Sequence, residues 1–397
     1  MLVPFLPNIR TSGGQTRWYN IIKYLSKDHE ITLFSLIKDD AEKQFIPELE
    51  KYCKKVCVFK RPKSPWTLRN ILLTGFSWYP FLVMRNFSLE EKRALAKELT
   101  EHEYDVIHAE TFYVFPHIPT KTSVPSILVE QTIEYQVYLH YVIHEAPLYL
   151  KPLFLIDVLK LQYWEKYFWK KTDRLVAVSP EDKKIMQELI PGIEADIIPN
   201  GVDTKYYVEK KVQKKSPPRV LYGVTNFEWL QNLEAVNILL DEVWPKVYAR
   251  FPSAKLWLAG RKIPQKFVEL GNKRDDIEIT ESIDDSRDAY LGSTVMVTPI
   301  RGSGGTRLKI LEALAAGLPI VSTTVGVAGL DLTNKKHALI SDDYDKLVDY
   351  TVDLLNDPKR AKEIGDAGQE FVRKHFDWKQ IVAMHEGIYK KAIGKRS

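Results

Sequence analysis

The sequence predicts an α/β protein with two doubly wound parallel sheets. From Ile31 onward, short β-branched runs alternate with amphipathic helical stretches, a pattern typical of parallel sheets covered on both faces. A lysine- and proline-rich stretch without apolar periodicity, residues 209–219, interrupts the series, and a second series follows it. The length of 397 residues exceeds what one core usually supports, so two domains of similar size are expected.

Eleven apolar runs are expected to be strands. In the first domain they are EITLFSLI, VCVF, YDVIHAE, SILVEQ and RLVAVS, and in the second RVLYGV, AKLWLAG, IEIT, VMVTPI, PIVST and HALIS. The opening MLVPFLP leaves little of a usual first strand, so either that strand is short or the natural start lies upstream. Helices are expected over 15–25 and 233–251, and a final amphipathic helix over 378–393 is expected to bury Ile381, Met384, Ile388 and Ala392.

Composition excludes several classes of protein. A net charge of +5 favours anionic ligands weakly and does not argue for nucleic acid. Cys53 and Cys57 are the only cysteines, and we interpret them as ordinary residues of a reducing compartment. Neither a secretory signal nor a spanning apolar stretch is recognisable, so a cytoplasmic location is expected. The acidic pairs 39–40, 275–276, 284–285 and 342–343 lie in polar surroundings and predict solvated turns or helix starts, so no metal is expected.

A glycine-rich loop joins a strand to a helix in VMVTPIRGSGGTRLKILEALAAGLPIVSTTVG. Loops of this kind let backbone N–H groups approach an anion, and the helix N-terminus adds its positive dipole. On the helix, Leu308, Leu311 and Ala315 form the expected apolar stripe, and Glu312 lies at its edge. A carboxylate at the edge of a buried stripe needs a partner.

Two partners for Glu312 remain open on spacing alone. Lys309, three residues earlier, would make a routine helix ion pair. The alternative partner is a set of ligand hydroxyls, with Lys309 and Arg307 left to neutralise a diphosphate. The first interpretation predicts only a small effect on stability, whereas the second predicts a nucleotide site.

The chain resembles the family 4 glycosyltransferases. The resemblance rests on TSGGQTRWYNIIKYLS, VAVSPEDKK, IIPNGVD, YGVTNFEWLQNLEAV, LWLAGR and GSGGTRLKILEALAAGLPIVSTTVGVAGL. It implies the GT-B fold, in which two Rossmann-like domains face each other across a cleft, and a retaining transfer of a sugar from a nucleotide-sugar donor. The expected domains are 1–197, with the C-terminal helix of about 376–397 packed back on it, and a nucleotide-sugar domain over 198–375.

The resemblance also implies roles for particular residues. Glu312 matches the glutamate that holds the donor ribose, and Arg307 and Lys309 lie where basic groups could meet the diphosphate. These three are the expected catalytic residues. The remaining expected donor-binding positions are Gly13, Gly14, Arg261, Gly304, Gly305 and Thr306. Without the resemblance, Arg261 is equally well a surface residue after a strand, and Gly13 and Gly14 are a tight turn before a helix.

One position departs from the family pattern. Many members carry a second glutamate eight residues before the one matched by Glu312, where this chain has Gly304. The sugar hydroxyls must then be bound by backbone N–H groups of 304–306 or by another side chain. This departure keeps open a catalytically inactive nucleotide-sugar-binding or scaffold protein of the same fold. A GT-B epimerase is a second alternative, because fold alone does not fix the reaction.

The acceptor, a glycan or a lipid-linked molecule, is expected on the first domain. Candidates are His108, Glu130 and Glu134, because ligands of open α/β sheets gather at the carboxyl ends of strands. For His108 a hydrogen-bonded structural histidine is an equal alternative. The aromatic and basic stretches 61–83 and 138–171 suggest peripheral contact with an anionic membrane at its inner face, or else an aromatic helical layer within the domain.

Overall fold

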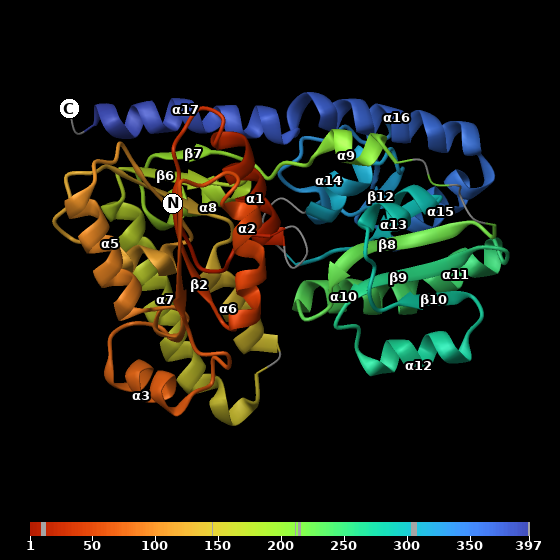
Figure 1. Ribbon diagram of the computed structural model, residues 1–397. Coiled ribbons are helices and arrows are strands. Elements are labelled where there is room, and N and C mark those ends of the chain that lie inside the picture. The colour runs from red at the N-terminus through yellow and green to blue at the C-terminus, as the bar shows by residue number, and fades with distance from the viewer. Residues whose placement is uncertain (9–12, 145, 211, 213–215, 303–307, 396–397) are drawn as a thin grey trace. The chain divides into compact units, whose positions relative to one another are not determined.

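The computed structural model describes residues 1–397 except 9–12, 145, 211, 213–215, 303–307 and 396–397. The chain divides into two compact units, one formed by Met1–Pro199 with Val382–Ser397 and the other by Asn200–Ile381. Each unit contains one parallel sheet with helices packed around it (Figure 1). The two doubly wound sheets predicted from the alternating pattern are therefore present.

The first unit contains a seven-stranded sheet in the order β3-β2-β1-β4-β5-β6-β7. Because the order reverses between β1 and β4, the switch point of the sheet lies between these two strands. All expected strands of this domain are present, with an abbreviated β1 before them and β7 after them. The strands are β1 (Leu2–Val3), β2 (Thr32–Ile37), β3 (Lys55–Lys60), β4 (Ile107–Glu110), β5 (Ser126–Glu130), β6 (Arg174–Ala177) and β7 (Ala195–Ile197).

Helices of the first unit connect these strands, and the amphipathic ones bury their apolar face. In α1, Trp18, Ile21, Ile22 and Leu25 are all buried, as their helical spacing predicts. The helices are α1 (Gly13–Leu25), η1 (Asp40–Phe45), α2 (Ile46–Leu49), α3 (Leu68–Phe76), α4 (Phe81–Arg85), α5 (Leu89–Glu101), η2 (Phe112–His117), α6 (Glu134–His144), η3 (Leu148–Leu150), α7 (Lys151–Lys171) and α8 (Pro180–Leu189).

The second unit contains a six-stranded sheet in the order β10-β9-β8-β11-β12-β13, so its switch point lies between β8 and β11. The strands are β8 (Arg219–Asn226), β9 (Lys255–Arg261), β10 (Ile277–Thr280), β11 (Val295–Thr298), β12 (Ile320–Ser322) and β13 (Leu339–Ile340). The helices are α9 (Thr204–Val208), α10 (Leu230–Ile238), η4 (Leu239–Val243), α11 (Trp244–Arg250), α12 (Gln265–Lys273), α13 (Ser286–Gly292), α14 (Leu308–Ala315), η5 (Val325–Val327), α15 (Tyr344–Asn356) and α16 (Pro358–His375).

Local sequence signals explain where several helices begin. Ser179 caps α8 by accepting a hydrogen bond from the Asp182 amide, and a proline occupies the first turn. Among the acidic pairs, Asp39, Asp285 and Asp343 cap η1, α13 and α15, as predicted for helix starts. One member of these pairs differs from the prediction.

Asp276 is not a solvated turn residue but is buried. It accepts a hydrogen bond of 2.7 Å from Trp244 Nε1 and pairs with Arg274. The prediction failed because the partner indole comes from another helix, 32 residues away. The expected helix over 233–251 also differs, since the π-helical turn η4 separates α10 from α11.

The last helix, α17 (Trp378–Gly394), begins in the second unit and belongs to the first from Val382 onward. Ile381, Ile388 and Ala392 are buried as expected, whereas Met384 is 44% exposed. The buried face instead includes His385 and Tyr389. Burying polar side chains here depends on partners from other elements, which helical spacing does not reveal.

Candidate functional site

The switch point of the second sheet gathers the side chains around Glu312. The Glu312 carboxylate accepts a hydrogen bond of 2.9 Å from the hydroxyl of Tyr290 in α13. Desolvation raises the pKa of Glu312 to about 7, against the opposing effect of hydrogen bonds from Tyr290 and Tyr207. The side chain keeps partial exposure. A carboxyl group with these properties changes charge near neutral pH and can still accept hydrogen bonds from a ligand.

Lys309 lies inside the protein rather than on a solvated helix face. Its ammonium group donates to the hydroxyl of Tyr222 at 2.9 Å and to Oδ1 of Asn232 at 3.0 Å, and it lies 4.0 Å from the centroid of the Tyr222 ring. The expected single apolar stripe of α14 is therefore wrong in detail, because this helix is buried on nearly all sides. Lys309 and Glu312 hold different partners, which favours a ligand site over a routine ion pair.

A glycine in β8 leaves space for Lys309. Gly223 has φ +119°, and a Cβ placed there would lie 2.9 Å from Met296 Cε and 3.2 Å from Lys309 Cδ. The pairing of β8 with β9 shifts between Leu221 and Val224 at the same place. This irregularity brings the amide of Val224 to 3.3 Å from the Tyr290 hydroxyl. The strand distortion thus positions both the lysine and the tyrosine.

Arg261 ends β9 with its side chain exposed at the carboxyl edge of the same sheet. Gly260 precedes it with φ +151°, and a Cβ at this glycine would lie 1.9 Å from the carbonyl oxygen of Thr225. The close approach of β8 and β9 therefore requires glycine. It places the Arg261 side chain just beyond the strand end, where ligands of open α/β sheets bind.

Several expected donor residues fall on the glycine-rich loop. Gly304, Gly305, Thr306 and Arg307 lie outside the described residues. Gly13 and Gly14 form the beginning of α1, after β1. A Cβ at Gly14 would lie 3.2 Å from Oε1 of Gln131, so the glycine allows α1 to begin close to the end of β5.

Two of the acceptor-side candidates lie on opposite faces of the first sheet. His108 pairs with Ile127 in register, so Glu130, three residues further along β5, points to the other face. Glu130 accepts a hydrogen bond of 2.9 Å from Trp169 Nε1 and one of 3.3 Å from the Phe112 amide. Burial, followed by the nearby Glu165 carboxylate, raises the pKa of Glu130.

His108 belongs to a buried polar network. Its ring nitrogens bond the Tyr389 hydroxyl at 2.8 Å and Glu110 Oε1 at 3.1 Å. Glu110 Oε2 accepts further hydrogen bonds from Trp18 and Gln131, each of 3.0 Å. Burial opposes ionisation of Glu110, but the His108 hydrogen bond and the Arg17 charge lower its pKa to about 2. This network ties β4 to α1 and α17, as expected of a structural histidine.

Glu134, at the beginning of α6, is half-buried, whereas His108 and Glu130 are buried. Burial raises its pKa to about 7, and the charge of Arg85 only partly offsets this effect. Glu165 Oε1 accepts a hydrogen bond of 2.7 Å from the Glu134 amide, which fixes the first turn of α6. The Glu134 side chain is thus held at the carboxyl edge of the first sheet.

An exposed apolar surface that includes several aromatic side chains, called here the exposed aromatic surface, lies on α3 and the residues beside it and on α6, η3 and α7 of the first unit. Lys160 of α7 connects this helix to the end of α3, because its Nζ donates to the carbonyl oxygens of Thr74 and Ser77 at 2.8 and 2.9 Å. Other aromatics of the same stretches, including Phe168 and Trp169, are buried, as the alternative of an aromatic helical layer predicts. The exposed members are Trp66, Leu68, Ile71, Leu72, Leu73, Phe76, Trp78, Tyr141, Ile143, Leu148, Tyr149, Leu153, Leu155, Ile156, Leu159, Tyr163 and Tyr167.

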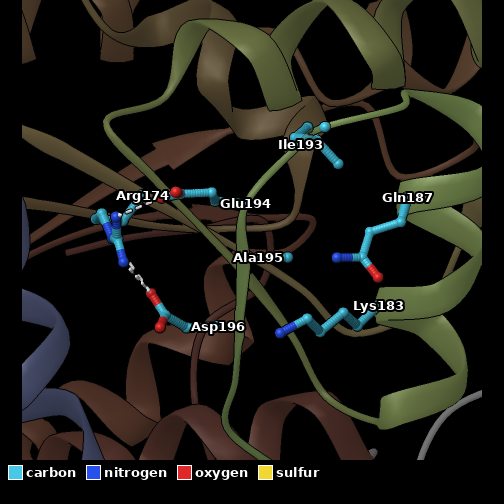
Figure 2. A pocket seen from close by; sticks show the side chains of 8 residues that line it. Arg174, Lys183, Gln187, Ile193, Glu194, Ala195 and Asp196 are labelled. Carbon is cyan, nitrogen blue, oxygen red and sulfur yellow. Dashed lines mark hydrogen bonds and ion pairs between the residues drawn. The ribbon is translucent and has the colours of Figure 1, made fainter.

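A separate pocket of about 370 Å³ lies away from both switch points. Arg174 and Ala195 line it from the amino ends of β6 and β7, opposite to the edge where ligands of such sheets bind. Figure 2 shows Arg174 held by Glu194 and Asp196, with contacts of 3.3 and 2.9 Å. With its guanidinium neutralised, this pocket is a poor candidate for an anionic donor.

Within the described part of the chain, no cluster of histidine, cysteine and acidic side chains could hold a metal ion. No described helix combines the length and the apolar character needed to span a bilayer. Cys53 and Cys57 are both free thiols.

Four site residues were not identified from the sequence. Tyr207 and Tyr290 contact Glu312 from α9 and α13, and Tyr222 and Asn232 contact Lys309 from β8 and α10. Tyr222 and Asn232 lie within YGVTNFEWLQNLEAV, one of the stretches that carries the family resemblance. The sequence contains no local signal for Tyr207 or Tyr290, because each reaches the site from a separate helix.

The chain has the two Rossmann-like units of a GT-B type α/β enzyme. One switch point holds the desolvated carboxyl group of Glu312 and the buried ammonium group of Lys309. The family model described as "Glycosyltransferase Family 4" matches residues 11–206, and that described as "Glycosyl transferases group 1" matches residues 218–357. The two matches span most of the chain. The chain therefore belongs to the family 4 glycosyltransferases.

Known relatives agree with this assignment. The chain is 23% identical over 380 residues to an uncharacterized 44.6 kDa protein in the cps region of Klebsiella pneumoniae, covering 90% of each chain. It is 24% identical over 202 residues to a GDP-mannose-dependent monoacylated alpha-(1-6)-phosphatidylinositol monomannoside mannosyltransferase of Corynebacterium glutamicum, covering 46% of this chain and 52% of the relative.

Solved structures of low sequence identity share the fold. Sucrose-phosphate synthase from Thermosynechococcus elongatus superposes with a TM-score of 0.71 at 17% identity, covering 99% of this chain and 98% of the other. WaaG, a glycosyltransferase involved in lipopolysaccharide biosynthesis, gives 0.67 at 14% identity, covering 98% of each chain. Anabaena HepE in complex with UDP and glucose gives 0.64 at 15% identity, again covering 98% of each chain.

Proposed function

We propose that this glycosyltransferase moves a sugar, with retention at the anomeric carbon, from a nucleoside-diphosphate sugar to a glycan or lipid-linked acceptor. The observation that carries the proposal is the arrangement of Glu312 and Lys309 at the switch point of the second sheet. Glu312 supplies a hydrogen-bond acceptor for ribose hydroxyls, and Lys309 supplies a fixed cation three residues away. HepE, a protein of the same fold, binds UDP and glucose, which supports a nucleotide-sugar donor.

The reaction needs stabilisation of the leaving diphosphate as negative charge develops on it. Fixed cations and backbone donors provide this without reorganisation, and one such donor is typically worth about 3 kcal/mol. We assign this role to Lys309, Arg261 and the expected Arg307, together with the backbone of the glycine-rich loop. The proposed reaction therefore requires no divalent metal.

The exposed aromatic surface supports an acceptor at a membrane. Trp66, Phe76 and Trp78 are 61%, 91% and 67% exposed. Lys160 binds the carbonyl oxygens of Thr74 and Ser77, next to Phe76 and Trp78 in the chain. A basic side chain beside exposed aromatic ones favours the interface of an anionic bilayer. We propose that the enzyme binds peripherally to the cytoplasmic face of such a membrane and receives its acceptor there.

Incubation with a panel of nucleotide sugars, with and without cell membranes, tests the function. We expect membrane-dependent nucleotide release from one donor, unchanged by a chelator. Nucleotide-sugar binding without release would favour the inactive binding or scaffold protein, which the glycine at position 304 leaves open. Isomerised donor without release would favour an epimerase. Chelator-sensitive binding restored by magnesium would contradict the metal-free reaction.

A further inference from the structure

Two arginines without matching anions lie at the carboxyl edge of the first sheet. Arg61 directly follows β3 and is only 9% exposed, and its Nη1 donates to Asn86 Oδ1 at 3.2 Å. Its guanidinium lies 4.4 Å from the centroid of the Phe5 ring. Arg85, the last residue of α4, precedes Asn86 in the chain. The Nε atoms of both arginines are buried and have no hydrogen-bond partner among the described residues.

The charge of Arg85 acts on Arg61. Burial, and then the charge of Arg85, lowers the pKa of Arg61 to about 10. Neither arginine forms an ion pair with any residue in the described part of the chain. The carboxyl groups within electrostatic range are Glu42 near Arg61 and Glu134 near Arg85, and burial raises the pKa of Glu134 to about 7. A buried cation beside a half-buried one, with little compensation, destabilises the fold unless a ligand uses the pair.

We infer that Arg61 and Arg85 form a subsite for a phosphate group of the acceptor. A guanidinium presents a planar fork of N–H donors that fits a phosphate in bidentate fashion. The edge is the one at which open α/β sheets bind ligands. Thr111, which follows β4 at this edge, has φ 75°, an unfavourable backbone conformation for a β-branched residue that functional sites can retain.

The same helix connects the arginine pair to the exposed aromatic surface. Phe81 begins α4 and stacks on the ring of Trp66 with centroids 4.6 Å apart, and Arg85 ends it. An acceptor with an apolar part and a phosphate could therefore contact Trp66 with the first and Arg85 with the second. The inference rests on the proposed glycosyltransferase function and names the chemical class of its acceptor.

Inorganic phosphate tests the subsite when the donor site is already filled. Thermal stabilisation of the full chain by phosphate is measured in saturating nucleoside diphosphate, for the wild type and for Arg85→Gln, Arg85→Lys and Arg93→Gln. Arg93 is an exposed arginine of α5, so its substitution removes the same charge outside the subsite. Arg85→Gln is expected to weaken phosphate binding about tenfold or more, since charge-assisted hydrogen bonds are lost. Arg85→Lys keeps the charge but loses the planar pair of N–H donors, so its phosphate affinity should lie between those of the wild type and Arg85→Gln.

A second readout separates binding from folding. Because the Arg85 side chain makes no hydrogen bond to a described residue and lies near Arg61, Arg85→Gln should melt at the same temperature as the wild type or above it. Equal phosphate binding in Arg85→Gln and wild type would overturn the inference, as would an equal loss in Arg93→Gln. Weaker nucleoside diphosphate binding in Arg85→Gln would assign the arginines to the donor instead, and overturn it too. Failure of the wild type to bind any nucleoside diphosphate would count against the proposed function rather than against this subsite.

Discussion

The hydroxyl of Tyr290 donates a hydrogen bond of 2.9 Å to Glu312 and lies 3.3 Å from the amide nitrogen of Val224. The carboxyl group on α14 is therefore held in place by α13, and α13 by the irregular end of β8. This arrangement leaves Glu312 with a pKa of about 7 and with room to accept further hydrogen bonds. It makes Glu312 the residue whose substitution tests the site best.

Glu312→Gln is expected to weaken nucleoside diphosphate binding by roughly 1.5 to 3 kcal/mol, because an amide keeps the shape of the side chain but not its charge-assisted acceptance. Free nucleotide and sugar donor should be affected alike, since both carry the ribose. Calorimetric titration measures the change, with Glu363→Gln, an exposed glutamate of α16, as the control. Unchanged affinity in Glu312→Gln would remove the ribose assignment.

Nucleotide affinity should depend on pH through Glu312. Ribose hydroxyls donate to the ionised carboxylate, whose pKa in the free protein is about 7. Affinity should therefore increase as pH rises from about 6 to 8, with release of a proton on binding. The free energy of unfolding should change with pH in the opposite direction. The raised pKa of Glu312 stabilises the folded state fully below pH of about 4.5, and this contribution is lost as pH rises through about 7.

Glu312→Gln should reduce this pH dependence of both affinity and stability. Calorimetry in buffers of different ionisation enthalpy measures the proton release directly. A pH profile that is the same in wild type and variant would show that another group controls it.

Lys309→Met is expected to lower turnover more than binding, because a cation facing the leaving group matters most when negative charge develops there. A loss of one such contact typically costs about a hundredfold in kcat. Single-turnover kinetics beside calorimetry separates the two effects, and Lys184→Met, at an exposed lysine of α8, is the control. A variant that loses affinity and turnover equally would contradict the assigned role.

Membrane association should depend on both charge and aromatic side chains. Vesicles containing anionic lipid are expected to carry the enzyme in flotation at low ionic strength and to release it at high salt, because screening weakens the attraction. The double variant Trp66→Ser, Phe76→Ser should float poorly. Substituting Trp229, an exposed tryptophan of the second unit, with serine should leave flotation unchanged. Absence of wild-type binding at low salt would refute the membrane proposal.

Much of this architecture follows from local patterns. The strands were predictable because a parallel strand covered on both faces requires a short, continuous apolar run, and such runs can be identified in the sequence. The edge position of Glu312 was predictable from helical spacing on α14, and the family resemblance assigned it a ligand. Asp39, Asp285 and Asp343 were predictable as helix starts because an N-cap contacts residues of its own helix, so the signal is local in the sequence.

Contacts between distant segments were decided by the tertiary structure alone. Strand order brings Tyr290 to Glu312 and Tyr222 to Lys309, across 22 and 87 residues of chain. Helical periodicity places a lysine on a solvated face, yet Lys309 is buried. Its burial is tolerated because the Tyr222 hydroxyl and the Asn232 amide oxygen replace the water that its ammonium group loses. The buried network of His108 was likewise not predictable, since its partner Tyr389 comes from the last helix. Periodicity records which face of an element is apolar, whereas the partner of a buried polar group depends on which elements the fold places beside it.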